Sequence, residues 1–417
     1  MIGAKITQAY SVENQWRQKL IWLTMAVSCI VFVEPAPYDI LVMLLVAVLF
    51  SLNLRVPEES GVAIFLLAMF TVGNLVGTLA SDDPGTTVRP LATRFYMVAS
   101  WVLFTSVIAA NTESVMRVIW KGYTFAAVLA ATWGCLEFYD FLPDMMVGDT
   151  FGRASGPFKD ANVFGPFLIP IALHTVAHMP YSRGLALVAN VTKFLIIIFA
   201  LLLSFSRGAW MNFLFAFGLY MIFSIYSAPS NKDKLRLITL VIFLSFAAGL
   251  TLLWAVNNTA AGQRFVDRAT VFKTYDLESG GRFDTQSRVL REIGSTPLGL
   301  GPGMSPSEFG IEPHNLYLHI AIEGGWLAAI SFYLFLLLTV VRGTVRSRLR
   351  CNLQTDLHIV LAALSGILLQ SLFIDSTHWR HMWLLIAMLW ALTIAIDRGR
   401  ASDNNDVMFN DGLTDIK

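Results

Sequence analysis

Residues 194–223, FLIIIFALLLSFSRGAWMNFLFAFGLYMIF, decide the fold because they place a single arginine, Arg207, between two long apolar runs. A helix needs about 20 mostly apolar residues to cross the hydrocarbon core of a bilayer. We therefore interpret the two runs as parts of successive membrane spans. A charged side chain in or beside the hydrocarbon costs roughly 2.5–3.5 kcal/mol even on the most lenient scale. Arg207 is therefore predicted to have a function, and we take it as a candidate binder of an anion.

The rest of the chain shares this apolar character. Of its 417 residues, 55% are hydrophobic and 14% are charged, whereas about 25% would be charged in a soluble domain. We expect an all-α polytopic membrane protein with about twelve transmembrane helices and one large periplasmic loop before the tenth. The predicted spans are centred near residues 26, 45, 70, 101, 125, 170, 194, 216, 245, 328, 364 and 388.

The first apolar run has no small-residue cleavage site after it, so we expect it to stay in the protein as a membrane anchor. Residues 1–396 are predicted to form a single transmembrane domain. Residues 397–417 are polar and rich in Asn and Asp, a composition that predicts a disordered cytoplasmic tail. The three cysteines show no paired spacing, so neither a disulfide framework nor a metal knuckle is indicated.

The distribution of cations predicts the orientation. Twelve spans put both termini on one side, and the positive-inside rule identifies that side as the cytoplasm. The clearest cytoplasmic stretches are then 232–236 and 342–350. The remaining cations face outward: Arg89, Arg94, Arg153, Lys159, Arg207, Arg264, Arg268, Lys273, Arg282, Arg288, Arg291 and Arg380.

Half of these outward cations lie in one loop, 257–313, which is the only long loop. A basic loop above a membrane can hold a polyanion such as the phosphates of a lipid carrier. For Arg264, Arg268, Lys273 and Arg282, we favour ordinary ion pairs with the acidic residues of the loop over binding of such a polyanion. We expect the loops 138–161 and 257–313 to form the functional site together.

The first candidate segment is residues 152–162, GRASGPFKDAN. Its Gly and Pro predict a tight loop, and Asp160 or Asn162 is expected to cap the helix that follows. Two cations in so short a loop, Arg153 and Lys159, indicate contact with an anion.

The second candidate segment is the turn around Arg207. Ser204 and Ser206 can cap the span that follows, which places Arg207 in its first turn. A cation is mildly unfavourable there, whereas an anion at the helix N-terminus would meet both backbone donors and the guanidinium. The alternative is an arginine that extends to the lipid headgroups.

The third segment contains Arg288 and Arg291, which share a helix face at i, i+3 spacing. The following residues 297–303, PLGLGPG, let the backbone approach another group closely. No strand precedes this glycine run, so a dinucleotide site is not indicated.

The fourth segment runs from Pro313 to Glu323. Pro313 is expected in the first turn of the tenth span, so that His314 lies at its outer mouth. Imidazole titrates near neutral pH, and the alternative for His314 is a structural role. His319 and Glu323, at i, i+4 spacing, are expected to form a buried polar pair that supports the site.

No outward segment carries two histidines and a carboxylate in a clean metal-binding arrangement, so no metal is expected. The residues from Asp375 to His381 come nearest and are a minor candidate for lining the site, together with Arg380. Asp82 and Asp83 are interpreted as part of a turn.

The order and spacing of four motifs resemble the O-antigen ligase and polymerase superfamily of bacterial envelope proteins. The motifs are residues 156–162, 206–209, 297–303 and 314–318. The resemblance implies an inverting glycosyltransferase without metal or other cofactor. It would move O-polysaccharide from undecaprenyl pyrophosphate to lipid A-core at the periplasmic face of the bacterial inner membrane. Its partners would be these two lipids and the bilayer, and no nucleic acid.

On this resemblance, Arg207 and Arg288 would hold the pyrophosphate, bidentate where possible. His314 would accept the proton of the acceptor hydroxyl. Eight further residues are expected to bind substrate: Arg153, Lys159, Asn162, Arg291, Asn315, His319, Glu323 and Arg380.

Three other classes stay open at this point. An O-antigen polymerase would use the same residues with a second lipid-linked glycan as acceptor. A peptidoglycan-type polymerase should depend on an outward aspartate such as Asp284. A transporter or flippase needs charged residues near mid-span and usually a repeat, and neither is evident in the sequence.

Overall fold

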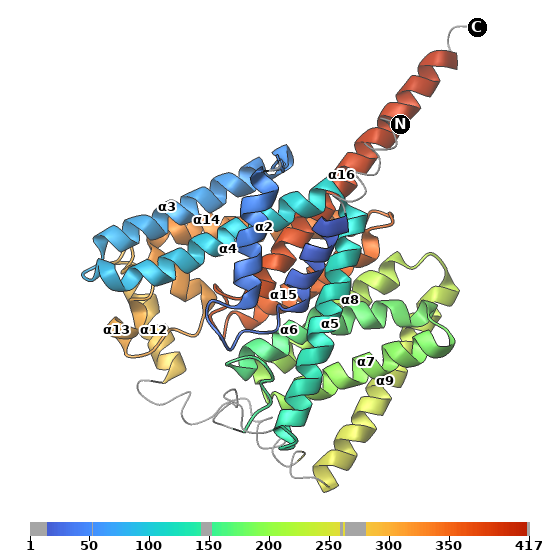
Figure 1. Ribbon diagram of the computed structural model, residues 1–417, viewed down its shortest axis with the longest axis horizontal. Helices are drawn as coiled ribbons and strands as arrows, with labels where there is room; N and C mark the ends of the chain where they lie inside the picture. The colour runs from blue at the N-terminus through green and yellow to red at the C-terminus, as the bar shows by residue number, and fades with distance from the viewer. Residues whose placement is uncertain (1–14, 52, 143–151, 259–261, 263–280, 415–417) are drawn as a thin grey trace.

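The computed structural model describes residues 15–51, 53–142, 152–258, 262 and 281–414, and these residues form helices and connecting segments without a strand. Figure 1 shows the helices packed as one bundle, from which the end of the last helix projects. The first helix covers residues 15–26. The longer elements that follow are α2 (Pro37–Ser51), α3 (Gly61–Ala80), α4 (Pro84–Ala110), α5 (Thr112–Phe138), α6 (Ala161–His178), α7 (Gly184–Leu203), α8 (Arg207–Ser227), α9 (Asn231–Asn258), α12 (Arg282–Glu292), α13 (Ser305–Phe309), α14 (Leu316–Arg346), α15 (Gln354–Gln370) and α16 (Arg380–Thr414).

Each apolar run that predicted a span is helical over at least part of its length, and the first of them only up to residue 26. Among the described residues, seven helices are long and apolar enough to cross a membrane: Glu58–Ala80, Pro84–Ala110, Ala161–Tyr181, Gly184–Leu203, Arg207–Ser227, Leu316–Arg346 and Arg380–Ala401. The expectation of an all-helical, multi-pass membrane protein is therefore confirmed, while the number twelve stays a prediction.

Two expectations concern segments at the edge of this bundle. The helix α16 continues to Thr414, through most of the segment 397–417 for which the composition predicted disorder, because extending an existing helix adds one hydrogen bond for each residue that is fixed. The predicted loop 257–313 contains the helices α12 and α13. Arg264, Arg268 and Lys273 lie outside the described residues.

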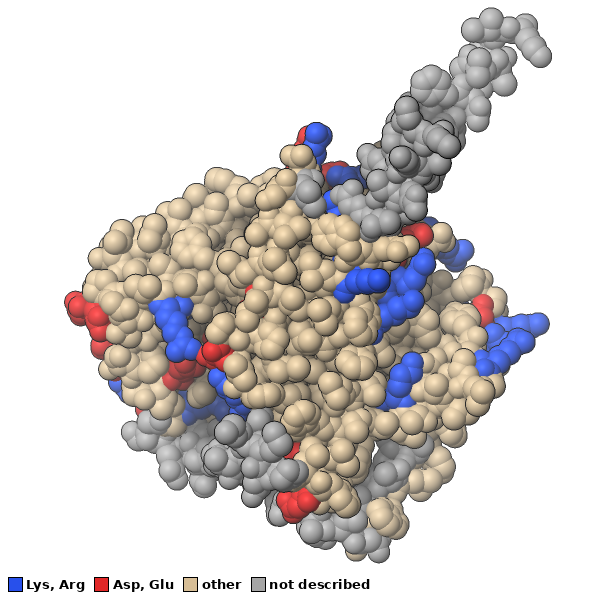
Figure 2. Space-filling view, in the orientation of Figure 1, with Lys and Arg blue, Asp and Glu red and all other residues tan. Residues whose placement is uncertain are grey.

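The two groups of cations lie at opposite ends of the helices. At one end, Arg342 and Arg346 pair with Asp397 at 3.0 and 2.9 Å. The starts of α8 and α16, with Arg207 and Arg380, lie at the other end. We call these the Arg346 end and the Arg207 end. In Figure 2, Lys and Arg gather near the start of α5 and the α8–α9 connection, while the surface between the ends is almost uncharged. That the Arg346 end is cytoplasmic remains a prediction.

Small residues let α3 and α14 approach closely, which is how helices commonly associate in a membrane. A Cβ atom added to Gly73 would lie 2.5 Å from the backbone nitrogen of Ala328. One turn further along α3, a Cβ on Gly77 would lie 2.8 Å from the carbonyl oxygen of Glu323. This contact fixes the first half of α14 against the bundle and so positions the residues at its start.

We predict that Gly73→Val destabilises the protein, because the valine side chain would overlap the backbone of α14. Overpacking of this kind costs roughly 1–3 kcal/mol. The matched control is Gly218→Val in α8, where a Cβ meets nothing within 4 Å. Thermal unfolding in detergent should show a lower midpoint for Gly73→Val alone. Equal midpoints for the two variants would contradict the described packing of α3 on α14.

Candidate functional site

The start of α14 is fixed by Asn315. Its side-chain oxygen accepts hydrogen bonds from the backbone nitrogens of Tyr317 (3.0 Å) and Leu318 (3.1 Å), and its amide donates to the carbonyl of Leu372 (2.9 Å). The expectation that Pro313 begins this helix is wrong, because asparagine is a far better N-cap and the helix starts after it. His314 consequently precedes the helix, half-buried, with a positive φ of 47°.

The helix α12 holds His314 from the other side. Gln286 donates from Nε2 to the carbonyls of Pro313 (3.1 Å) and His314 (3.3 Å). Arg288, half-buried on the same helix, donates from Nη1 to the carbonyl of Phe309 (3.4 Å), and its guanidinium lies 5.4 Å from the centre of the Phe309 ring. Hydrogen bonds thus connect the backbone at His314 to α12, and Arg288 of α12 to α13.

Arg291 differs from Arg288 although the two are only three positions apart. Its side chain is exposed, whereas Arg288 packs against Phe309. Of the two arginines, only Arg288 is held by α13.

The surroundings of His314 keep its imidazole neutral. Burial lowers the pKa of His314 below its usual value, and the nearby cation Arg282 lowers it further. The acidic residues Glu312, Asp375 and Asp160 act in the opposite direction but more weakly. A histidine that is neutral at physiological pH can accept a proton.

The Arg207 turn is fastened to the loop 152–162. Ser206 caps α8 by accepting from the backbone nitrogen of Ala209 (3.3 Å), and it donates from Oγ to Asn162 Oδ1 (2.8 Å). Asp160, rather than Asn162, caps α6 through the Asn162 nitrogen (2.8 Å). Arg207 is therefore the first residue of a helix whose cap is held by Asn162.

The starts of α8 and α14 meet at the end of α15. A Cβ on Gly208 would lie 3.1 Å from Nε2 of Gln370. The next residue, Ser371, accepts from the backbone nitrogen of Leu316 (2.9 Å). Because α12 is attached to His314, all four candidate segments come together at the Arg207 end.

The cations Lys159 and Arg380 are already paired with carboxylates. Lys159 lies 2.6 Å from Glu34 Oε1, and this hydrogen bond lowers the pKa of Glu34. Arg380 donates from Nε and Nη2 to the two oxygens of Asp39, both at 2.6 Å. Both cations line a cavity of about 190 Å³ together with Asp160. Their acidic partners, Glu34 and Asp39, lie far away along the chain and so carry no local signal in the sequence.

Arg153 is also close to a carboxylate. Its Nη2 lies 3.6 Å from Asp160 Oδ1, and only 14% of the Arg153 side chain is exposed. The first candidate segment thus contains its own counter-charge.

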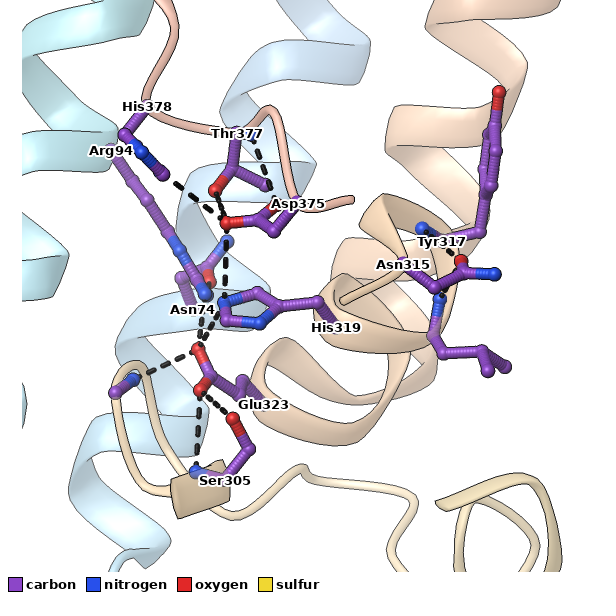
Figure 3. A network of polar contacts seen from close by, with 12 residues as sticks. Asn74, Arg94, Ser305, Asn315, Tyr317, His319, Glu323, Asp375, Thr377 and His378 are labelled. Carbon is purple, nitrogen blue, oxygen red and sulfur yellow. Dashed lines mark hydrogen bonds and ion pairs between the residues drawn. The ribbon is translucent and has the colours of Figure 1, made fainter. Parts of the chain in front are cut away.

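A buried polar network surrounds His319 and Glu323, as Figure 3 shows. Glu323 in α14 forms an ion pair with Arg94 of α4, which also donates to Asn74 of α3. His319 Nε2 lies 3.0 Å from Glu323 Oε2, so the predicted i, i+4 pair is present. On its other side, His319 Nε2 lies 3.9 Å from Asp375 Oδ2. The network thus links four segments through side chains that are almost fully buried.

Glu323 also holds the segment that precedes His314. It accepts hydrogen bonds from the Gly303 nitrogen (2.8 Å) and from Ser305 Oγ (2.6 Å). The glycine run packs against α14, because the Gly301 nitrogen donates to the Glu323 carbonyl (2.9 Å). The close approach predicted for residues 297–303 is therefore an approach to α14, at the point where Gly325 interrupts the helix with a φ of 71°.

Asp375 connects this network with the 190 Å³ cavity. It accepts from Thr377 Oγ1 (2.7 Å) and lies 3.4 Å from Nδ1 of His378, which lines the cavity. Burial alone would raise the pKa of Asp375, but His319 and His378 together lower it below its usual range. A charged carboxylate is thus kept between two histidines.

Arg94, Asn74 and Ser305 were not identified as site residues from the sequence. The one local signal was Arg94 itself, a cation within an apolar stretch, which was interpreted only as an outward residue. It is 7% exposed at the side chain and lies inside the bundle.

We predict that Arg94→Met is strongly destabilising, because it leaves Glu323 charged and buried; breaking a buried pair in this way costs roughly 3–5 kcal/mol. Arg94→Met with Glu323→Gln should cost less than the two single changes added together. The control is Arg398→Met, since Arg398 pairs with Glu59 at a partly exposed site where a pair contributes at most about 1 kcal/mol. Thermal unfolding of the four variants measures this. If Arg94→Met and Arg398→Met lower the unfolding midpoint by the same amount, the buried pair of Arg94 and Glu323 is no more important for stability than an exposed pair, and the prediction is wrong.

Comparison with known proteins indicates what one segment of the chain resembles. No curated protein matches the chain. A family model described as O-antigen ligase matches residues 193–333, a segment that contains Arg207, Arg288, His314 and Glu323. The matched segment is similar to the O-antigen ligase family, and the apolar helices indicate a multi-pass membrane protein.

Proposed function

We propose that the protein is an O-antigen ligase that transfers O-polysaccharide from undecaprenyl pyrophosphate to a sugar of lipid A-core at the periplasmic face of the inner membrane. The observation that carries this proposal is the convergence of the Arg207 turn, Arg288 and His314 at one end of the helices. A basic cluster beside a neutral histidine suits a reaction in which a diphosphate leaves and a hydroxyl attacks.

Arg207 and Arg288 hold the diphosphate in this proposal. As the bond between the anomeric carbon and the diphosphate oxygen breaks, negative charge develops on the leaving group. Guanidinium groups fixed in a water-poor site stabilise such charge by several kcal/mol. The side chains Phe199 and Leu214 are exposed on α7 and α8, on either side of the Arg207 turn, and offer an apolar path for the carrier tail.

His314 acts as the general base. The acceptor hydroxyl oxygen attacks the anomeric carbon from the face opposite the diphosphate, which inverts the configuration, and its proton passes to the imidazole. General-base catalysis of this kind contributes about 10²–10⁴ in rate. The lowered pKa of His314 supports this role, because the imidazole is then neutral before the reaction.

The other expected substrate-binding residues divide into two groups. Arg153, Lys159, Arg291 and Arg380 are proposed as secondary contacts to phosphate or acceptor, and three of these four are near carboxylates that substrate would have to compete with. Asn162, Asn315, His319 and Glu323 make hydrogen bonds within the protein, which favours a positioning role for them.

We predict that His314→Ala and Arg207→Ala each lower the rate at which purified protein transfers glycan from undecaprenyl pyrophosphate to lipid A-core. The expected loss is at least about 10²-fold. His178→Ala is the matched control, since His178 is exposed at the Arg346 end and should keep normal activity. The assay contains EDTA and offers both lipid A-core and a second lipid-linked glycan as acceptors.

Each outcome of this assay decides a specific point. Extension of the lipid-linked glycan without transfer to lipid A-core would make the protein a polymerase. A near-normal rate for His314→Ala would remove His314 as the base. Loss of wild-type transfer in EDTA would contradict a metal-independent mechanism.

The pH dependence follows from the same residue. Transfer should be full at neutral pH and fall as the pH drops through the pKa of His314, below 6.5. Arg282→Gln removes a cation that lowers this pKa, so the acid limb of kcat/KM should move to higher pH. Arg291→Gln is the matched control, because it takes the same charge from the same helix and should leave the limb in place. An acid limb that Arg282→Gln does not move would contradict the electrostatic coupling.

A further inference from the structure

A second cavity lies at the Arg346 end, remote from the candidate site. It measures about 690 Å³ and is bounded by α5, α6, α7 and the start of α15. Three cations line it: Arg117 and Lys121 on α5 and Lys193 on α7. Nothing in the proposed transfer reaction uses this cavity.

These three cations have no partner among the residues that the structure describes. Among the described residues, none of the three side chains takes part in an ion pair or hydrogen bond, in contrast to Lys159 and Arg380 at the other end. Two carboxylates also line the cavity, those of Glu113 and Asp356, and Asp356 accepts from Nε1 of Trp120 at 3.0 Å. The three cations therefore outnumber the carboxylates of the lining, and none of the three is paired with them.

Rigid aromatic groups line the same cavity. The rings of Trp120 and His174 lie 4.6 Å apart, and those of His174 and His178 lie 4.3 Å apart. These tilted ring pairs form one wall of the cavity that the three cations also line. Phosphate oxygens are the natural partners for such a set, because charge-assisted hydrogen bonds are the strong ones.

The surface next to the cavity favours a phosphate that is attached to a lipid. Along α5, one and two turns after Lys121, Phe125 and Leu129 are 50% and 38% exposed. They continue the cationic face of α5 into the apolar band of the helix. Basic pockets between membrane helices recognise anionic lipid headgroups in this manner, whereas a free phosphate ion would make no use of the apolar ridge.

We propose that this cavity binds the phosphate-bearing headgroup of an anionic phospholipid through Arg117, Lys121 and Lys193, with an acyl chain along Phe125 and Leu129. The site is separate from the proposed transfer site, and its occupancy is measured without any transfer reaction.

The test is native mass spectrometry of the purified full-length protein, titrated with phosphatidylglycerol, phosphatidylcholine or inorganic phosphate. Arg117→Gln with Lys121→Gln and Lys193→Gln should weaken phosphatidylglycerol binding by about tenfold or more. The matched control is Lys232→Gln with Lys234→Gln and Arg236→Gln, which removes the same charge at the same end. It should stay within about twofold of wild type. Phosphatidylcholine should bind more weakly than phosphatidylglycerol.

Three results would overturn the proposal. Equal binding of the two lipids would show that no anionic headgroup is selected. An equal loss of phosphatidylglycerol affinity in both triple variants would show that the lipid responds only to the overall surface charge of this end. Inorganic phosphate binding that the first triple variant abolishes, without selective lipid binding, would make this a site for the soluble ion. If the triple variant does not fold, Lys193→Gln alone should weaken phosphatidylglycerol binding about threefold or more, and an unchanged affinity would count against the proposal.

Discussion

The ion pair between Arg94 and Glu323 is the constraint on which the Arg207 end depends. Both charges are almost fully buried inside the bundle, and neither would be tolerated there alone. Because Glu323 also accepts from Gly303 and Ser305, the pair holds the segment between α12 and α14 against the bundle. His314, Arg288 and their hydrogen-bonded neighbours take their positions from this attachment.

The two ends of the helices differ in how their cations are neutralised. At the Arg207 end, Lys159 and Arg380 face carboxylates from distant parts of the chain, and a substrate diphosphate would enter a region where the charge is already organised. At the Arg346 end, Arg117, Lys121 and Lys193 surround an open cavity without such partners among the described residues. The same protein therefore offers two different environments for phosphate, one proposed for catalysis and one for a lipid headgroup.

Local patterns predicted most of the helices and part of the site. The apolar runs predicted the helices, and Ser206, one of the two serines expected to cap α8, does cap it. The prediction that α14 begins at Pro313 was wrong, because Asn315 has a stronger preference for the N-cap position than Pro313 has for the first turn. The pairing of Arg94 with Glu323 joins residues 229 positions apart, and only the packing of α3, α4 and α14 brings them together. Long-range pairings of this kind leave no periodic signal in a sequence.

The most direct test of the central claim is a cryo-electron microscopy structure of the protein in lipid nanodiscs with bound undecaprenyl pyrophosphate. The account predicts density for the diphosphate in contact with the guanidinium groups of Arg207 and Arg288, with His314 facing the space where the acceptor hydroxyl must lie. Diphosphate density at the Arg346 end, or away from both arginines, would contradict it.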